Sequence, residues 1–113
     1  MPSGKQLLGA DAERRVRRHY LLRGYRVLEA NARAGGNEVD AILRRGGRLV
    51  FCEVKCRSGD GFGTPAEAVG PEKERRLRRA AEAWLARHAE LAELEVAFEV
   101  AAVRGRRIVR MPL

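Results

Sequence analysis

The chain has 113 residues, of which 45% are hydrophobic and 34% are charged. This length fits one domain over residues 1–113, and the absence of an apolar run as long as a membrane span favours a cytoplasmic protein without a membrane partner. The net charge of +8 comes from 23 basic residues, 20 of them arginine, against 15 acidic ones. Because arginine matches phosphate oxygens, this excess is typical of nucleic-acid-binding proteins, although an arginine-rich solvated surface would explain it equally well.

The first predicted element is a helix over residues 5–23. Its apolar stripe recurs every four residues, at Leu8, Ala12, Val16 and Tyr20. Glu13 leans toward this stripe, so its carboxylate needs a partner. Two interpretations stay open: an exposed flank position paired with Arg17, or a carboxylate that serves a site.

Two strands joined at Gly46-Gly47 follow, because a Gly-Gly pair between apolar runs is a hairpin signal. We expect this hairpin over residues 38–56, preceded by a strand at 25–29 and a turn at 31–37. The register about the glycines places Ile42 opposite Phe51. Since both faces carry apolar residues, the hairpin is predicted to be central, with helices on both sides. Cys52 and Cys56 are interpreted as small core residues.

The same register brings Asp40 opposite Glu53 and Glu38 opposite Lys55, all on one face at one end of the hairpin. Three carboxylates and a lysine crowded together predict a divalent-metal site. Asp40 and Glu53 would hold Mg²⁺, with Mn²⁺ as a substitute, and Glu13 could complete the ligand set. Lys55 would position or activate the metal-bound water.

Residues 57–70 are rich in glycine and either close over a substrate or serve as a connector. A second helix is expected to begin at Pro71. Its buried stripe comprises Leu77, Ala80, Ala81, Trp84, Leu85 and His88. Lys73 lies on that stripe and could reach a phosphate or cover apolar surface, and Arg75, Arg76, Arg78 and Arg79 form a basic ridge beside it. Strands at 96–103 and 108–111 complete the sheet.

Asp40 together with Glu53-Val54-Lys55 resembles the PD-(D/E)xK nuclease core, with Val39 in place of the proline. A longer set of residues resembles the YraN family. This set comprises Gly9, Glu13, Gly24-Tyr25, Asn31, Glu38-Val39-Asp40, residues 50–55, Arg57, Gly63, Pro65, Ala68-Val69, Lys73 and Phe98-Glu99-Val100. The resemblance implies a restriction-endonuclease-like fold close to archaeal Holliday-junction resolvases: an α/β fold of the α+β type with a mixed sheet. Its order is a helix, a three-stranded antiparallel meander, a helix and further strands.

The resemblance implies a site at Glu13, Asp40, Glu53 and Lys55. Lys73 matches the family lysine after the Gly-rich loop, and Glu38 matches the glutamate of the family's Gly-Glu-Ile-Asp motif, where it would support the site. Four positions depart from the family pattern: Ala12 and Asn37 replace glycines, and Ala97 and Glu99 replace the Arg and Asp of an Arg-Phe-Asp sequence. The last departure leaves open what the acid of the final strands does.

Taken together, these features predict a Mg²⁺-dependent endonuclease that acts on DNA, including branched intermediates of repair or recombination. The expected nucleic-acid contacts are Lys73, Arg57, Arg75, Arg76 and Arg79. A homodimer would suit the cutting of both strands of a junction. One alternative is a non-catalytic nucleic-acid-binding module that retains the fold; another is an ion-pair network, from Glu38 to Lys55 and from Glu13 to Arg17, in a small interaction protein.

Overall fold

The computed structural model describes residues 4–57 and 69–113, and the side chains of all of these except residues 4–8 and Arg57. The elements are α1 (Gly4–Leu21), β1 (Arg26–Ala34), β2 (Asn37–Arg45), β3 (Arg48–Arg57), α2 (Pro71–Ala86), the short 3₁₀ helix η2 (Ala89–Leu91), β4 (Glu95–Arg104) and β5 (Arg107–Pro112). This order confirms the predicted layout of a helix, a meander, a helix and further strands. The interpretation of 57–70 as a closing loop falls mainly on residues 58–68, which lie outside the described ones.

Within these residues the five strands form one mixed sheet in the order β1-β2-β3-β4-β5. The pairs β1–β2, β2–β3 and β4–β5 are antiparallel, whereas β3 and β4 are parallel. A parallel pair needs a crossover connection, and α2 lies in that connection. Neither helix in the described part of the chain is long and apolar enough to cross a membrane.

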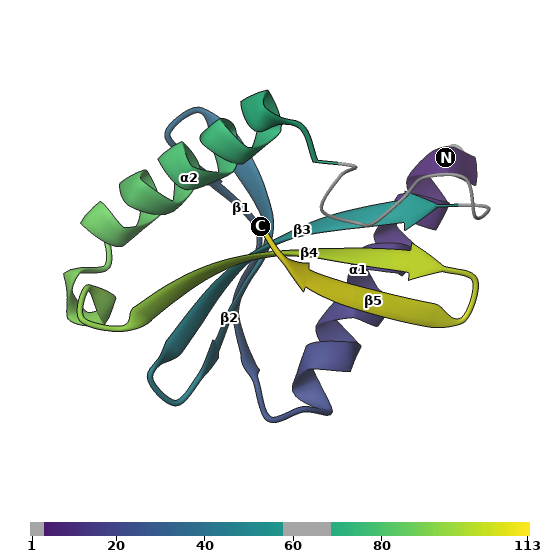
Figure 1. The fold of residues 1–113 in the computed structure, drawn as a ribbon, viewed down its shortest axis with the longest axis horizontal. Coiled ribbons are helices and arrows are strands. Elements are labelled where there is room, and N and C mark those ends of the chain that lie inside the picture. The colour runs from purple at the N-terminus through teal and green to yellow at the C-terminus, as the bar shows by residue number, and fades with distance from the viewer. Residues whose placement is uncertain (1–3, 58–68) are drawn as a thin grey trace.

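The helices cover opposite faces of the sheet, with α2 on one side and α1 behind the sheet in Figure 1. On the α1 face the core contains Val16, Tyr20, Leu43, Val50 and Cys52, together with other buried residues. On the α2 face it contains Ile42, Phe51, Leu77, Ala80 and Trp84, among others. The prediction of a central hairpin covered on both sides is therefore confirmed, and burial on both faces explains why the hairpin has so few polar residues away from its acidic end.

The first strand and the turn after it differ from the prediction. The strand runs from Arg26 to Ala34 instead of ending at Glu29, and the turn predicted at 31–37 shortens to Gly35-Gly36. Asn31 has a positive φ of 51°, yet the chain stays paired with β2 on both sides of it. Ala32 and Ala34 are buried in the α2 core, so tertiary burial outweighs the turn signal of the local sequence.

Helix α2 begins at Pro71, as predicted, and buries Leu77, Ala80, Ala81 and Trp84. Leu85 is only partly buried, and His88 lies beyond the helix, where its ring stacks on Trp84 at 3.7 Å between centroids. The interpretation of Cys56 as a core residue is wrong: Cys52 is buried and Cys56 is exposed. Cys56 lies near the end of β3, beyond the part of the strand that the core covers.

Candidate metal and phosphate site

The predicted register of the central hairpin is confirmed, since Ile42 pairs with Phe51 and Arg45 with Arg48. The backbone pairing of β2 with β3 stops at Ala41 and Cys52, one residue short of Asp40. Beyond this pair the side chain of Asp40 links the two strands, because its Oδ2 accepts a hydrogen bond of 2.7 Å from the Val54 backbone N–H. Asp40 is thereby fixed at the point where the two strands separate.

Three carboxylates meet at this point. Glu13 from α1, and Glu38 and Asp40 from β2, each offer an oxygen within 4.8 Å of those of the other two. Glu13 is half-buried, and no ion pair joins it to Arg17 among the described side chains. The predicted pairing of Glu13 with Arg17 is therefore not formed, and Glu13 lies instead beside Glu38 and Asp40.

Asn31 holds two of these carboxylates in place. With its amide nitrogen turned toward them, it donates to Glu13 Oε2 at 3.2 Å and to Glu38 Oε1 at 3.0 Å. Its left-handed backbone conformation aims the side chain at the cluster, and asparagine tolerates that conformation better than most residues. Sequence reasoning placed Asn31 in a turn and named it only within the family resemblance. The signal that could have identified Asn31 is its position between two segments in which apolar and polar residues alternate.

Glu53 lies beside this group and is buried, with a side chain only 6% exposed. Its Oε1 is 3.4 Å from Lys55 Nζ and 3.1 Å from Lys73 Nζ. Lys55 thus pairs with Glu53 and not with Glu38, and the predicted ion-pair network of Glu38 with Lys55 is not formed. Lys73, from the first turn of α2, is the second cation of Glu53.

Burial and nearby carboxylates change the acidity of Asp40. Burial, the largest cause, and the neighbouring Glu53 and Glu13 carboxylates together raise the pKa of Asp40 to about 7, although the hydrogen bond from the Val54 N–H acts in the opposite direction. A carboxyl group with such a pKa is half-protonated near neutral pH. A cation bound beside it would favour the ionised form.

A cleft of about 260 Å³ opens next to Glu53. It is lined by Arg33, Gly36, Asn37, Glu38, Glu53, Lys73, Arg76 and Leu77. Acidic groups are present in the same cleft as three basic side chains, which come from β1 and α2. This arrangement suits a ligand that has an anionic group and is bound together with a cation.

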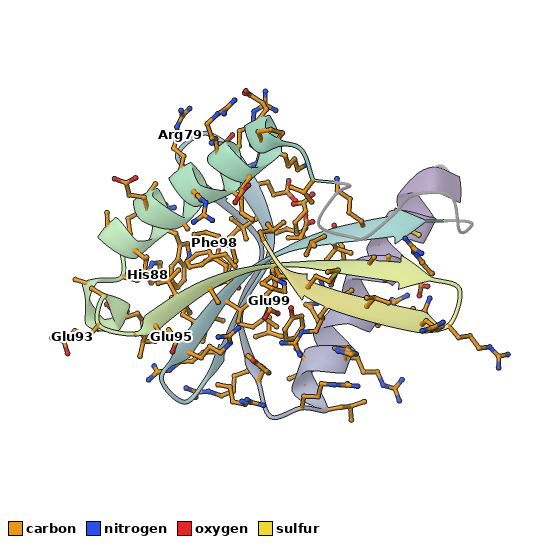
Figure 2. The ribbon with its side chains drawn as sticks, viewed as in Figure 1. Arg79, His88, Glu93, Glu95, Phe98 and Glu99 are labelled. Carbon is orange, nitrogen blue, oxygen red and sulfur yellow. The ribbon has the colours of Figure 1, made fainter. Side chains whose placement is uncertain are left out.

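The arginines predicted to bind nucleic acid divide into separate groups. Arg76 lines the cleft and also pairs with Glu72 at 3.4 Å. Arg75 pairs with the same Glu72 at 3.0 Å. Arg79 extends from the outer side of α2, away from the sheet, as Figure 2 shows. The structure therefore groups Arg76 with Lys73 and leaves Arg75 and Arg79 outside the cleft; the side chain of Arg57 is outside the described part.

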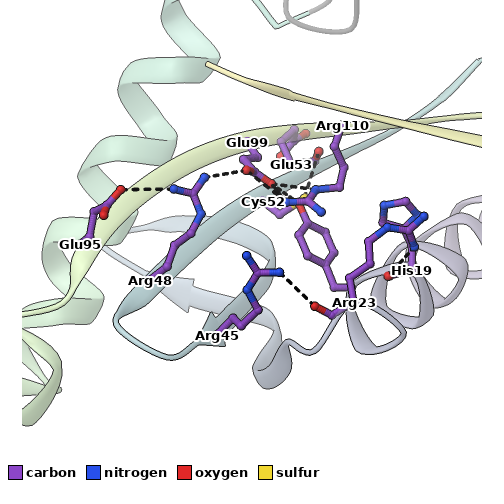
Figure 3. Close-up of polar contacts among 10 residues, drawn as sticks. His19, Arg23, Arg45, Arg48, Cys52, Glu53, Glu95, Glu99 and Arg110 are labelled. Carbon is purple, nitrogen blue, oxygen red and sulfur yellow. Dashed lines mark hydrogen bonds and ion pairs between the residues drawn. The ribbon is translucent and has the colours of Figure 1, made fainter.

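A second polar cluster lies around Glu99 of β4. Glu99 is buried, and it accepts hydrogen bonds from Tyr20 Oη at 2.6 Å, Arg48 at 3.0 Å and Arg110 at 3.0 Å (Figure 3). Burial acts to raise the pKa of Glu99, but the bonds from Tyr20 and Arg48 and the charge of Arg110 outweigh it and hold that pKa below its usual range. The acid of the final strands thus belongs to a satisfied structural network, which sequence reasoning had left open.

The ligand chemistry of the acidic site fits a hard divalent cation. Glu13, Glu38 and Asp40 supply only oxygen donors close together, as Mg²⁺ and Mn²⁺ prefer. Glu53 could join them, because it is in electrostatic contact with Asp40. The residues present therefore fit the predicted metal, with Glu38 as an added candidate ligand.

The fold and the site define a mixed α/β protein with an acidic cluster and a Glu-x-Lys strand at the centre of its sheet. Comparison of the sequence with known families matches residues 12–103 to the uncharacterised protein family UPF0102, and the chain belongs to that family. This agrees with the YraN-like resemblance found in the sequence.

Individual members of this family are similar over most of the chain. A UPF0102 protein of Frankia alni is 48% identical over 74% of this chain and 70% of its own length. A relative from Acidothermus cellulolyticus is 44% identical over 77% of this chain and 66% of its own length. A third, from Synechococcus, is 41% identical over 89% of this chain and 78% of its own length. None of these names states an activity.

Proposed function

We propose that this protein is a metal-dependent nuclease with a PD-(D/E)xK core that hydrolyses phosphodiester bonds in DNA. The observation that carries the proposal is the meeting of Glu13, Asp40, Glu53 and Lys55 from α1, β2 and β3 where the hairpin strands separate. With Glu38, four carboxylates lie around the end of the strand that carries Lys55, and few structural roles require such an arrangement. Burial and the Glu53 and Glu13 carboxylates raise the pKa of Asp40 to about 7, and a carboxyl group with so large a shift is typical of functional sites.

In this proposal Glu13, Asp40 and Glu53 hold Mg²⁺ or Mn²⁺, and Glu38 supports them. The bound cation would lower the pKa of a water molecule and stabilise negative charge on the phosphate. Lys55, whose ammonium group is held by Glu53, orients the attacking water and donates a hydrogen bond to it or to the phosphate. The water oxygen loses a proton and forms a bond to phosphorus, the bond from phosphorus to the leaving oxygen breaks, and that oxygen takes up a proton from solvent. The products are a phosphate monoester and a hydroxyl group.

Charge supports nucleic acid as the substrate class. The net charge of +8 favours binding to a polyanion, and Lys73 and Arg76 place positive charge in the cleft beside the acids. Branched DNA as the substrate is a prediction from the family resemblance, and a homodimer is a prediction from the need to cut both strands of a junction. Measurement of the molecular mass in solution, for the protein alone and for its complex with a four-way junction, tests whether two copies of the chain associate.

The test is cleavage of labelled duplex, single-stranded, flap and four-way-junction DNA with Mg²⁺ or Mn²⁺. We expect cleavage by the native protein and a loss of at least about a hundredfold in Asp40→Asn and Lys55→Met, with DNA binding retained. Glu93→Gln is the matched control, because it removes a carboxylate at the left edge of Figure 2, away from the site. Absence of cleavage of every substrate by the native protein would overturn the proposal.

The second candidate is a non-catalytic nucleic-acid-binding module. The observation in its favour is that Glu53 already has two lysine partners and so can be stable without a metal. It predicts DNA binding that weakens steeply with salt, is unaffected by EDTA and is accompanied by no cleavage. The same DNA panel, repeated with EDTA, separates the two candidates.

A further inference from the structure

Two lysines share one carboxylate oxygen in this site. Lys55 Nζ lies 3.4 Å and Lys73 Nζ 3.1 Å from Oε1 of Glu53. The lysines differ in exposure, because the side chain of Lys55 is 22% exposed and that of Lys73 is 48% exposed. Lys55 is on the same strand as Glu53, whereas Lys73 reaches it from another element, α2.

Glu53 needs positive charge at all times, because a buried carboxylate without a partner is costly. A divalent cation bound to Glu53 and Asp40 would supply that charge. It would also repel an ammonium group in contact with the same oxygen. Lys55 is held near Glu53 by its place on β3, so the half-exposed Lys73 is the cation that can leave at low cost.

We propose that Lys73 is an exchangeable counter-ion: it pairs with Glu53 in the metal-free protein and passes to a phosphate of the nucleic acid when a divalent cation binds. This inference rests on the proposed function for its metal and its substrate. It assigns Lys73 a positioning role that neither a fixed ion pair nor a permanent phosphate contact would have.

The cleft gives the released side chain a destination. Lys73 lines it together with Arg76 from the next turn of α2 and Arg33 from β1. Among the described residues Arg76 forms one ion pair, with the exposed Glu72, and such a pair is weak and easily exchanged. A phosphodiester group in the cleft would therefore meet three basic side chains as soon as Lys73 leaves Glu53. Metal binding and phosphate binding would then favour each other.

The first test is calorimetric titration with Mn²⁺ of the native protein and of Lys73→Met, which removes the charge and keeps an unbranched side chain only one atom shorter. Because the variant loses a cation that competes for Glu53, we expect it to bind Mn²⁺ roughly tenfold more tightly than the native protein. Arg79→Met is the matched control, since it removes one positive charge from the same helix outside the cleft, and we expect a change below about twofold. Equal or weaker Mn²⁺ binding in Lys73→Met than in the control would overturn the inference.

The second test follows the lysine itself by NMR of the side-chain ammonium groups. The chain has only three lysines, Lys5, Lys55 and Lys73, so the spectrum is simple to assign with Lys73→Met. On saturation with Mg²⁺ we expect the Lys73 signal to move to the position that it has in Glu53→Gln, where its partner is neutral. If Mg²⁺ binds and the Lys73 signal stays in place, the exchange is refuted while the metal site stands. If no variant binds Mn²⁺ or Mg²⁺, the proposed metal-dependent function fails, and the exchange fails with it.

Discussion

Asp40 and Glu99 are carboxylates of one sheet in opposite electrostatic surroundings. Glu99 is surrounded by donors, namely Tyr20, Arg48 and Arg110, and its pKa is lowered. Asp40 has one strong donor, the Val54 N–H, and its pKa is raised to about 7 by burial and by two neighbouring carboxylates. Satisfied charges of the first kind stabilise a fold, whereas unbalanced charges of the second kind are typical of functional sites.

The raised pKa of Asp40 predicts a pH-dependent stability. Since the folded protein binds the Asp40 proton more tightly than the unfolded chain does, this group stabilises the fold fully below about pH 4, and its contribution is lost as the pH rises to about 7. We expect this loss, on the order of a few kcal/mol, to be absent in Asp40→Asn. Urea unfolding between pH 4 and 8 without metal measures it. Equal pH dependence of the native protein and the variant would contradict the prediction, and Glu93→Gln serves as the control.

The Glu99 network predicts a stability effect that is independent of the metal site. Tyr20→Phe removes the 2.6 Å bond to Glu99, and we expect it to destabilise the fold by about 2 kcal/mol, because a hydrogen bond to a charged group is lost in the core. Urea unfolding at pH 7 measures this, and Mn²⁺ affinity should stay within about twofold. A loss of stability below about 0.5 kcal/mol would show that the arginines alone satisfy Glu99.

At the scale of elements, the turn between β1 and β2 fixes α2 over the site. Gly35 has a φ of +58°, and a Cβ there would lie 3.2 Å from the Ala83 Cβ and 3.3 Å from the Arg79 carbonyl oxygen. The turn and the helix therefore meet backbone to backbone. This contact and the burial of Leu77 and Trp84 hold α2 against the sheet, so that Lys73 in its first turn reaches Glu53.

Substitution of this glycine tests the close approach. Gly35→Ala combines a strained backbone with a collision against α2, whereas Gly46→Ala has the same sign of φ, at +57°, and open space around it. We expect Gly46→Ala to cost about 1 kcal/mol and Gly35→Ala about 1–2 kcal/mol more. Thermal or urea unfolding compares the two. Equal losses would mean that α2 shifts freely and that the turn does not fix it.

At the scale of the whole molecule, the excess of arginine is spread over both helices and several turns. Many of these residues are engaged with the protein itself: Arg48 and Arg110 bind Glu99, Arg78 pairs with Glu74, and Arg45 lies over Tyr25. Net charge therefore favours nucleic acid as a partner in general. The cleft, and not the charge count, selects the residues that should matter most.

Salt dependence of DNA binding separates cleft residues from the rest of the surface. With Ca²⁺ in place of Mg²⁺, we expect Lys73→Met and Arg76→Met each to reduce the slope of log Kd against log salt by about 1, since each removes a phosphate contact. Arg107→Met should reduce it less, because Arg107 is exposed at the β4–β5 turn, across the molecule from α2 in Figure 1. Fluorescence anisotropy from 50 to 300 mM salt measures the slopes, and equal slopes for all three variants would contradict a cleft-centred interface.

Local patterns in the chain were enough to predict the helices, the hairpin about Gly46-Gly47 and the pairing of Ile42 with Phe51. Helical periodicity, turn glycines and the alternation of apolar and polar residues are properties of residues close together in the chain, so they can be recognised without knowledge of the fold. They also brought Asp40, Glu53 and Lys55 to one end of the hairpin. The full length of β1 was not predicted, because burial of Ala32 and Ala34 under α2 outweighs the turn signal around Asn31.

Contacts between distant segments were decided only by the tertiary packing. The positions of α1 and α2 across the sheet decide three contacts of the site. Glu13 faces Asp40 and Glu38, and Asn31 binds two of these carboxylates. Lys73 joins Lys55 as a partner of Glu53. The same is true of Glu99, whose partners come from α1, β3 and β5. Such pairings have no local signature, because charge and hydrogen bonding act across space between residues far apart in the chain, and only the packed fold sets those distances.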